Sequence, residues 1–297
     1  MQQKITEIYN YNNHVSFEFF PPKTSHGLKQ VYQSIVRLKN MKPDFFSVTY
    51  GAGGSNAEKS LEIASALTNL AQVNCVAHLT CVGMDREQVE DLLKSLDYHG
   101  VNNVLALRGD PPAGQKRFVK PANGFAYASE LVRFIRERSD MGILVAGYPE
   151  GHGENPSKDD DFKHLVEKVG AGADGIVTQL FFENRFLFEM AENLEKAGVT
   201  VPLLAGIFPI SNAKQIIRIT ELSGANLPDK LKAGLERFAD SPEDMEKFGT
   251  DYAVEQIEGL LAGGVNCFHF YTMNRHRQIR EILSQLKSYF PRLHFWE

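Results

Sequence analysis

The stretch Ala171-Gly-Ala-Asp-Gly-Ile-Val-Thr-Gln-Leu-Phe181 decides the fold class, because it joins a helix end, a tight turn and a short apolar run. Gly172 has the residue type that most often ends a helix, and the run that begins at Gly175 has the length of a buried strand. The same order recurs at His99-Gly-Val-Asn and at Gly263-Gly-Val-Asn, each directly before another apolar run. This weak repeat predicts helices that alternate with buried parallel strands.

Eight apolar runs of this kind occur along the chain, and each is followed by a stretch long enough for an amphipathic helix. The predicted strands are Val15–Phe20, Phe45–Tyr50, Val73–Thr80, Asn103–Leu107, Ile143–Tyr148, Gly175–Phe181, Pro202–Ile207 and Cys267–Thr272. Eight such units close into a barrel in roughly 250 residues, so a chain of 297 residues suits one barrel. We predict an α/β fold, a single (β/α)8 TIM barrel, with residues 1–297 as one domain.

The spacing between the seventh and eighth runs is longer than the others. Ser211 to Gly263 has room for two extra helices, and Pro228 and Ser241-Pro242 are residue types that begin helices. We interpret this segment as an insertion in the barrel. The alternative fold is an open doubly wound sheet, which usually carries a Gly-x-Gly-x-x-Gly turn after its first strand. No such turn follows residues 15–20.

Charge and composition restrict the classes of function. The formal net charge is -5 and the sequence pI is about 6.0, so the chain lacks the basic surface that neutralises nucleic-acid phosphates. No segment approaches the ~20 apolar residues of a membrane helix. The three cysteines form no Cys-x-x-Cys pair, which indicates a reducing compartment and no zinc cluster. We expect a cytoplasmic protein without nucleic-acid or membrane partners.

Polar residues gather at the carboxyl ends of the predicted strands, where barrels of this class hold their active sites. Glu18 lies among phenylalanines, and apolar surroundings would raise the pKa of its carboxyl group and let it donate a proton near neutral pH. Glu18 can instead point to solvent, because alternation alone does not determine its face. Asp110 precedes two prolines, and it either fixes a carboxylate at the barrel mouth or caps a turn.

Two further residues at these strand ends have polar side chains. His78 has no partner at ligand spacing and is more typical of a hydrogen-bonded core histidine, so we predict no metal site. The amide of Gln179 suits the edge of a heteroaromatic ligand such as a pterin, or it is satisfied within the barrel. No phosphate-binding loop, nucleophile elbow or Cys-His pair is evident. The residues by themselves indicate a barrel enzyme that uses acid catalysis on a polar ligand.

Seven motifs lie in the predicted strands and the turns that follow them. They are Val15-Ser-Phe-Glu-Phe-Phe-Pro-Pro, Ser47-Val-Thr-Tyr-Gly-Ala, Ala77-His-Leu-Thr-Cys, Leu105-Ala-Leu-Arg-Gly-Asp, Tyr148-Pro-Glu, Thr178-Gln-Leu-Phe-Phe and Phe268-His-Phe-Tyr-Thr-Met-Asn-Arg. Together, in this order and over nearly the whole chain, they resemble the methylenetetrahydrofolate reductase family. The size is similar to the bacterial form, which has no carboxyl-terminal regulatory domain.

The resemblance implies a flavin enzyme of one-carbon metabolism. It implies non-covalent FAD, reduction of the flavin by NADH or NADPH, and hydride transfer from flavin N5 to 5,10-methylenetetrahydrofolate. The product would be 5-methyltetrahydrofolate, formed by ping-pong kinetics on one face of the flavin. Since relatives are commonly oligomers, we also expect a homo-oligomer.

The resemblance further implies roles for individual residues. Glu18 is similar to the family's general acid, which helps to open the methylene bridge to an iminium, and Asp110 to the carboxylate beside flavin and pterin. Gln179 matches a contact to pterin and nicotinamide, and Tyr271 and Arg275 match folate contacts. Positions that match FAD contacts are Thr49, Tyr50, Ala52, His78, Arg108, Gly109, Asp110, Tyr127, Ala128, Tyr148, His152, Asp161 and Lys168, with Arg108 and Lys168 as diphosphate partners.

Three residues depart from the family pattern. Ala213 stands where bacterial relatives often have an aromatic residue that packs on nicotinamide or folate, and His164 and Glu167 stand where some members have Asn and Arg. These changes affect the residues expected to bind NADH and FAD. Two other classes of protein are weighed against the reductase. A flavin-free pterin-binding barrel that transfers a one-carbon or methyl unit would lack the FAD set, and a catalytically silent barrel would lack Glu18 or Asp110.

Overall fold

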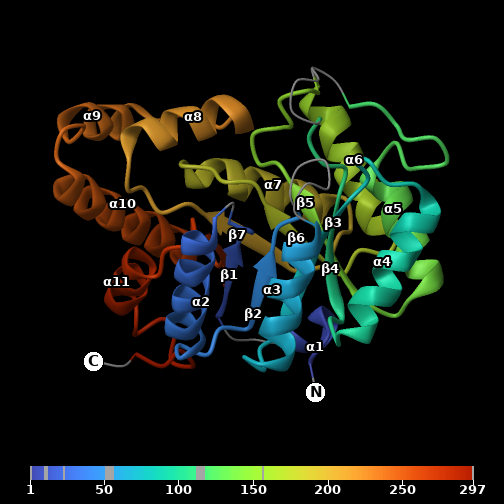
Figure 1. Ribbon diagram of the computed structural model, residues 1–297. Coiled ribbons are helices and arrows are strands. Elements are labelled where there is room, and N and C mark those ends of the chain that lie inside the picture. The colour runs from blue at the N-terminus through green and yellow to red at the C-terminus, as the bar shows by residue number, and fades with distance from the viewer. Residues whose placement is uncertain are drawn as a thin grey trace.

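A closed barrel of eight parallel strands forms the centre of the molecule (Figure 1). The computed structural model describes residues 2–9, 13–22, 24–50, 57–111, 118–155 and 157–295. The strands are β1 (His14–Phe19), β2 (Phe45–Val48), β3 (Cys75–Thr80), β4 (Asn103–Leu107), β5 (Gly142–Gly147), β6 (Gly175–Thr178), β7 (Leu203–Ile207) and β8 (Cys267–Tyr271). They follow chain order, and β8 pairs back onto β1. The predicted (β/α)8 barrel is confirmed, and the open doubly wound sheet is not what forms.

Every predicted strand is present, and the largest difference lies at the end of β6. The prediction ran to Phe181, whereas β6 ends at Thr178. Gln179 N still donates to the Gly147 carbonyl of β5 at 2.7 Å, but the Phe181 carbonyl accepts from a helix side chain, Gln256 Nε2, at 2.8 Å. Apolar residues continue across this change of partner, so the sequence pattern does not reveal it.

Helices cover the outside of the barrel between successive strands (Figure 1). They are α2 (Ser25–Lys39), α3 (Ala57–Asn69), α4 (Arg86–Tyr98), α5 (Ala128–Arg138), α6 (Lys158–Gly170), α7 (Asn184–Lys196) and, after β8, α11 (Arg277–Gln285). The α4 helix begins with a capping box, in which the Asp85 side chain accepts from Gln88 N. Within the described ranges, no helix is long and apolar enough to cross a membrane.

The repeated glycines of the sequence end helices as predicted. Gly100, Gly172 and Gly264 have φ angles of 74°, 116° and 87°. These are left-handed conformations, which a residue without a Cβ atom adopts at little cost. Each glycine therefore turns the chain out of a helix and toward the next strand.

The long segment after β7 contains three helices, α8 (Ala213–Ser223), α9 (Asp229–Arg237) and α10 (Pro242–Ala262). Pro228 precedes α9 and the Ser241 side chain caps α10, so both predicted helix starts are confirmed. Because α10 packs between α7 and α11, it completes the outer ring, and α8 and α9 are the two extra helices. Their apolar residues join Leu180 and Phe208 above the barrel.

A short helix that was not predicted, α1 (Ile5–Ile8), closes the amino-terminal end of the barrel (Figure 1). Ile5 and Ile8 are buried against inward-facing strand residues such as Leu144. Ile5 N also donates to Asn103 Oδ1 at 2.8 Å. This end of the barrel is therefore filled by apolar side chains, which leaves the opposite end for a site.

The side chains of β1 alternate between the outside and the inside of the barrel, and the sequence alone did not show which side Glu18 takes. Phe17 and Phe19 pack outward with residues of the surrounding helices. Ser16 and Glu18 alternate with them and therefore face the barrel interior. Glu18 contacts histidines of β3 and β8, so its side chain does not point to solvent on the outer face.

Candidate active site

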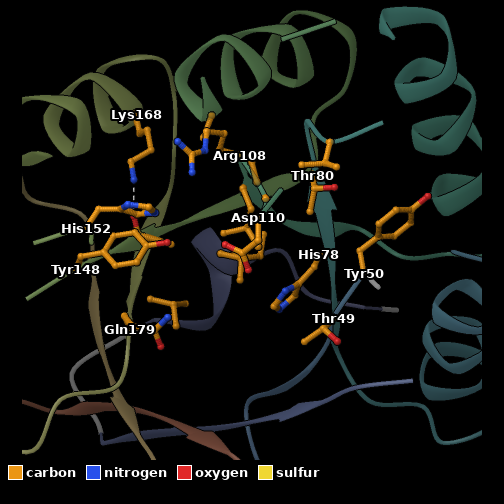
Figure 2. A pocket seen from close by; sticks show the side chains of 18 of the residues that line it. Thr49, Tyr50, His78, Thr80, Arg108, Asp110, Tyr148, His152, Lys168 and Gln179 are labelled. Atoms are coloured by element: carbon orange, nitrogen blue, oxygen red, sulfur yellow. Dashed lines mark hydrogen bonds between the residues drawn. The ribbon is translucent and has the colours of Figure 1, made fainter. Parts of the chain in front are cut away.

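A cavity of about 690 Å³ opens at the carboxyl ends of the strands, and its size suits a small-molecule ligand. Figure 2 shows Lys168, His152 and Tyr148 on one side of it, with His78, Thr49 and Thr80 opposite. Sequence-predicted residues that line the cavity are Glu18, Thr49, Tyr50, His78, Arg108, Gly109, Asp110, Tyr127, Ala128, Tyr148, His152, Asp161, Lys168, Gln179 and Tyr271. Topology thus gathers residues that are far apart in the sequence.

Two predicted site residues are not placed in this wall. Arg275 is exposed, does not line the cavity, and donates from Nη1 to Ser211 Oγ at 3.3 Å. Ala52 lies outside the described residues. The folate contact expected for Arg275 and the FAD contact expected for Ala52 therefore stay predictions.

Glu18 lies at the floor of the cavity between two histidines. Its Oε2 atom is 3.2 Å from His78 Nε2 and 3.5 Å from His269 Nε2. Burial opposes ionisation of the carboxyl group, but the charges and hydrogen bonds of the two histidines together outweigh it and lower the Glu18 pKa to about 2. The expectation of a raised pKa was wrong, because the sequence shows the neighbouring phenylalanines and not the histidines that the barrel brings in.

The loop after β4 carries Arg108 and Asp110 on either side of Gly109. Gly109 has a φ of 86°, and a Cβ atom there would lie 2.8 Å from Val82 Cγ2. Only glycine fits this turn without strain. Both charged neighbours line the cavity, and Figure 2 shows Asp110 between Arg108 and His78.

Two cations lie in one part of the cavity wall. Arg108 pairs with Glu154, with Nη2 and Oε2 at 2.7 Å, and its guanidinium lies 5.3 Å from the centre of the Phe118 ring. Lys168 Nζ donates to the Ala146 carbonyl at 2.5 Å. Desolvation lowers the Lys168 pKa to about 8, although the charge of Asp161 acts in the opposite direction. A bound anion would favour the protonated lysine.

The loop after β5 is held together by its own hydrogen bonds. The rings of Tyr148 and His152 meet edge to face with their centroids 4.5 Å apart. His152 N donates to Asp161 Oδ2 at 3.2 Å, and Glu154 N donates to His152 Nδ1 at 3.1 Å. Burial and the charge of Arg108 lower the His152 pKa, so the neutral imidazole is favoured.

Gln179 and Tyr271 both line the cavity, but they differ in which polar groups remain available to a ligand. The Gln179 carbonyl oxygen accepts from Leu180 N at 2.9 Å, so the amide nitrogen is the group that remains for a ligand. The Tyr271 hydroxyl donates to the Thr178 carbonyl at 2.6 Å. Tyr271 therefore presents its ring to the cavity, while its hydroxyl fastens β8 to the end of β6.

The Thr80 hydroxyl is an unsatisfied polar group of the cavity wall. The Thr80 hydroxyl is buried, lines the cavity and has no hydrogen-bond partner among the described residues. Buried polar groups in folded proteins are normally hydrogen-bonded, so this hydroxyl is suited to a polar ligand. Within the described ranges, no group of three or more His, Cys, Asp or Glu side chains is arranged to hold a metal ion.

Sequence reasoning missed two residues that matter at this site, Glu154 and His269, and it noted His164 only as a departure from the family pattern. Glu154 is the ion-pair partner of Arg108, and His164 stacks on Tyr127 with ring centroids 5.5 Å apart. His269 lies beneath Glu18 and is fully buried. Strand alternation could have found His269, because it shares the inward face of β8 with Tyr271. Nothing in the local sequence identifies the pairing partners of the other two.

The fold and the cavity define a TIM-barrel protein of the enzyme class, with a carboxyl group, an amide and two cations around one ligand site. A family model described as methylenetetrahydrofolate reductase matches residues 2–287. The chain belongs to the methylenetetrahydrofolate reductase family.

Relatives from plants and bacteria cover the chain to similar extents. A protein of Oryza sativa subsp. japonica named probable methylenetetrahydrofolate reductase (NADH) is 39% identical over 282 residues, which cover 91% of this chain and 48% of that protein. The 5,10-methylenetetrahydrofolate reductase of Escherichia coli (strain K12) is 34% identical over 275 residues, which cover 93% of this chain and 90% of that protein. The chain spans about half the length of the plant relative and nearly all of the bacterial one.

A solved structure shares the fold at low sequence identity. It is an uncharacterized protein from Clostridium thermocellum, described as binding two copies of 5-methyl-5,6,7,8-tetrahydrofolic acid. The TM-score is 0.58 at 14% identity, over 93% of this chain and 94% of that chain. This likeness supports the barrel architecture.

Proposed function

We propose that the chain is an FAD-dependent reductase that converts 5,10-methylenetetrahydrofolate to 5-methyltetrahydrofolate, with NADH or NADPH as the reductant. The observation that carries the proposal is the convergence of Glu18, Asp110 and Gln179 on the cavity that also contains Arg108 and Lys168. Membership in the reductase family supports it, as does the bacterial relative that the chain matches over nearly its whole length. The chain acts as one catalytic domain and assembles as a homo-oligomer.

The residues around the cavity fit FAD. Arg108 and Lys168 supply positive charge for a diphosphate, and burial lowers the pKa of Lys168, an effect that a bound diphosphate would oppose. The unpartnered Thr80 hydroxyl and the neutral His152 can bind the uncharged parts of the cofactor. When bound, FAD supplies the two-electron carrier between nicotinamide and folate.

Side chains of the protein would orient the folate and donate a proton to it. Glu18 donates a proton to the nitrogen of the methylene bridge, which opens the ring to a cationic iminium. The Asp110 carboxylate stabilises that positive charge, and the Gln179 amide nitrogen orients the pterin edge. Because the histidine contacts lower the Glu18 pKa to about 2, the carboxyl group must take up a proton before it can act as the acid.

An absorption experiment tests the proposal. Purified protein that shows flavin bands, loses them on anaerobic addition of NADH and regains them with 5,10-methylenetetrahydrofolate would perform both half-reactions in one cuvette. A colourless protein that does not take up added FAD would contradict the proposal. That result would favour the flavin-free pterin-binding transferase.

A further inference from the structure

His269, at the centre of β8, contacts Glu18 from within the barrel. Its ring is fully buried, whereas the Glu18 side chain retains 14% exposure at the cavity floor. His269 Nε2 is 3.5 Å from Glu18 Oε2, and His78 Nε2 approaches the same oxygen at 3.2 Å. Both contacts are made to Oε2, which leaves Oε1 as the carboxyl oxygen available to the cavity.

The His269 ring is held on several sides. Nδ1 is 2.7 Å from Ser16 Oγ, and Ser47 Oγ is 3.4 Å from Nε2. The ring stacks on Phe45, with centroids 5.8 Å apart and planes 23° apart, and meets the edge of Tyr271 at 5.6 Å. A ring packed and hydrogen-bonded in this way cannot rotate freely, so Nε2 is a fixed point beneath Glu18.

We propose that His269 is the positioning residue of Glu18: it holds Oε2 from beneath the cavity, so that Oε1 is the oxygen that meets the ligand. It touches neither the cavity nor a ligand within it, since it does not line the cavity wall. This inference rests on the proposed role of Glu18 as the proton donor to folate.

The electrostatics of the cluster agree with this geometry. The hydrogen bond and charge of His269, with those of His78, overcome burial and lower the pKa of Glu18. The other titratable group that faces the carboxyl group is Tyr271 from β8, whose own pKa is raised by burial and by the charge of Glu18. The polar groups of β1 and β2 that contact the His269 ring are the uncharged hydroxyls of Ser16 and Ser47. Removal of the imidazole should therefore raise the Glu18 pKa.

Three variants test whether His269 acts on Glu18 by holding its carboxyl group in position. His269→Phe keeps a ring of similar volume but removes both nitrogens, and His269→Gln retains an amide donor that can reach Glu18. His14→Gln is the matched control, because His14 is also a buried histidine on an inward face but pairs with Asp44 at the other end of the barrel. Stopped-flow absorption would follow flavin reduction by NADH and flavin reoxidation by 5,10-methylenetetrahydrofolate in FAD-loaded enzyme.

We expect His269→Phe to slow the folate half-reaction about 10- to 100-fold, because a displaced acid loses its alignment, while the NADH half-reaction stays within about twofold of the parent. The alkaline limb of its pH profile should move to higher pH. His269→Gln should recover most of the rate, and His14→Gln should match the parent in rate and profile. Parent-like folate rates and an unmoved pH limb in His269→Phe would overturn the inference while the proposed function stands.

A second measurement needs neither cofactor nor substrate. Infrared difference spectra between each protein and its Glu18→Gln counterpart, recorded without ligand from pH 4 to 8, report the protonated carboxyl band of Glu18. This band should be absent in the parent and should appear in the His269→Gln and His269→Phe backgrounds, more strongly in the latter. Identical spectra in the parent and His269→Gln would overturn the inference, and this comparison holds even if His269→Phe fails to fold. A parent enzyme that does not reoxidise with folate would refute the proposed function alone.

Discussion

Glu18 shows how a residue's chemistry depends on neighbours that are distant in sequence. Its nearest residues along the chain are phenylalanines, which by themselves predict a carboxyl group that resists ionisation. In the barrel, His78 and His269 approach one of its oxygens from two other strands and reverse the direction of the pKa shift. A proton donor at this position must therefore take up a proton before it can act.

Glu18→Gln tests the acid role directly. The variant should bind FAD and be reduced by NADH at the parent rate, because neither step needs the carboxyl proton. Folate reduction should fall by about 10²-fold or more, the usual contribution of a positioned general acid. Separate rapid-kinetic measurements of the two half-reactions would check this, and near-parent turnover of methylenetetrahydrofolate would refute the assignment.

Asp110→Asn removes a negative charge from the cavity that the flavin is proposed to occupy. We expect a slower folate half-reaction, because the cationic iminium loses a stabilising charge, and a higher flavin reduction potential. Spectroelectrochemical titration of the variant and the parent would measure the potential. An unchanged potential would show that Asp110 is not close to the flavin.

Lys168 makes cofactor binding depend on pH. Its pKa of about 8 in the protein means that the ammonium form is lost as pH rises through this value, whereas Arg108 stays charged. FAD affinity, measured by quenching of flavin fluorescence, should therefore fall between pH 7 and pH 9. Lys168→Met should bind FAD more weakly at pH 7 and lose this dependence, and a parent affinity that is flat across the range would contradict the proposed diphosphate contact.

At the scale of elements, α10 packs closely against the chain segment that follows β7. A Cβ atom at Gly249 would lie only 1.9 Å from the Ile210 carbonyl oxygen. Gly249 therefore lets the helix pass over the chain that leaves β7, directly beside the cavity residue Phe208. A Cβ atom at position 249 would force the helix and the Ile210 backbone apart.

Gly249→Ala should lower the free energy of unfolding by about 1–3 kcal/mol, the usual cost of overpacking. Gly170→Ala is the matched control, because a Cβ atom on this glycine at the end of α6 would lie more than 4 Å from every described residue beyond its own part of the helix. The control should be neutral or slightly stabilising. Chemical denaturation of the three proteins measures both changes, and equal stability of Gly249→Ala and the parent would show that the α10 contact is not tight.

At the scale of the whole molecule, the two ends of the barrel have different roles. The amino-terminal end is packed with apolar side chains, and the carboxyl-terminal end contains the cavity. Helix α1 and one inward apolar layer fill the amino-terminal end, while α8 and α9 add apolar packing above the carboxyl-terminal end. Asp44 links distant parts of the first end, since its carboxylate accepts from Val15 N at 2.7 Å and from Arg292 Nη2 at 2.5 Å. The carboxyl-terminal part of the chain is thereby fastened to the barrel, away from the cavity.

The sequence by itself determined the order of the eight strands, the glycines that end the helices and the position of the insertion, and its resemblance to the reductase family indicated many of the polar residues of the cavity wall. The strands, the glycines and the insertion follow from hydrophobic periodicity and from local backbone preferences, which act over a few residues. Only the tertiary structure decided the face of Glu18, the direction of its pKa shift, the pairing of Arg108 with Glu154 and the place of His269. Each of these depends on barrel closure, because strand register brings together side chains that no local pattern relates.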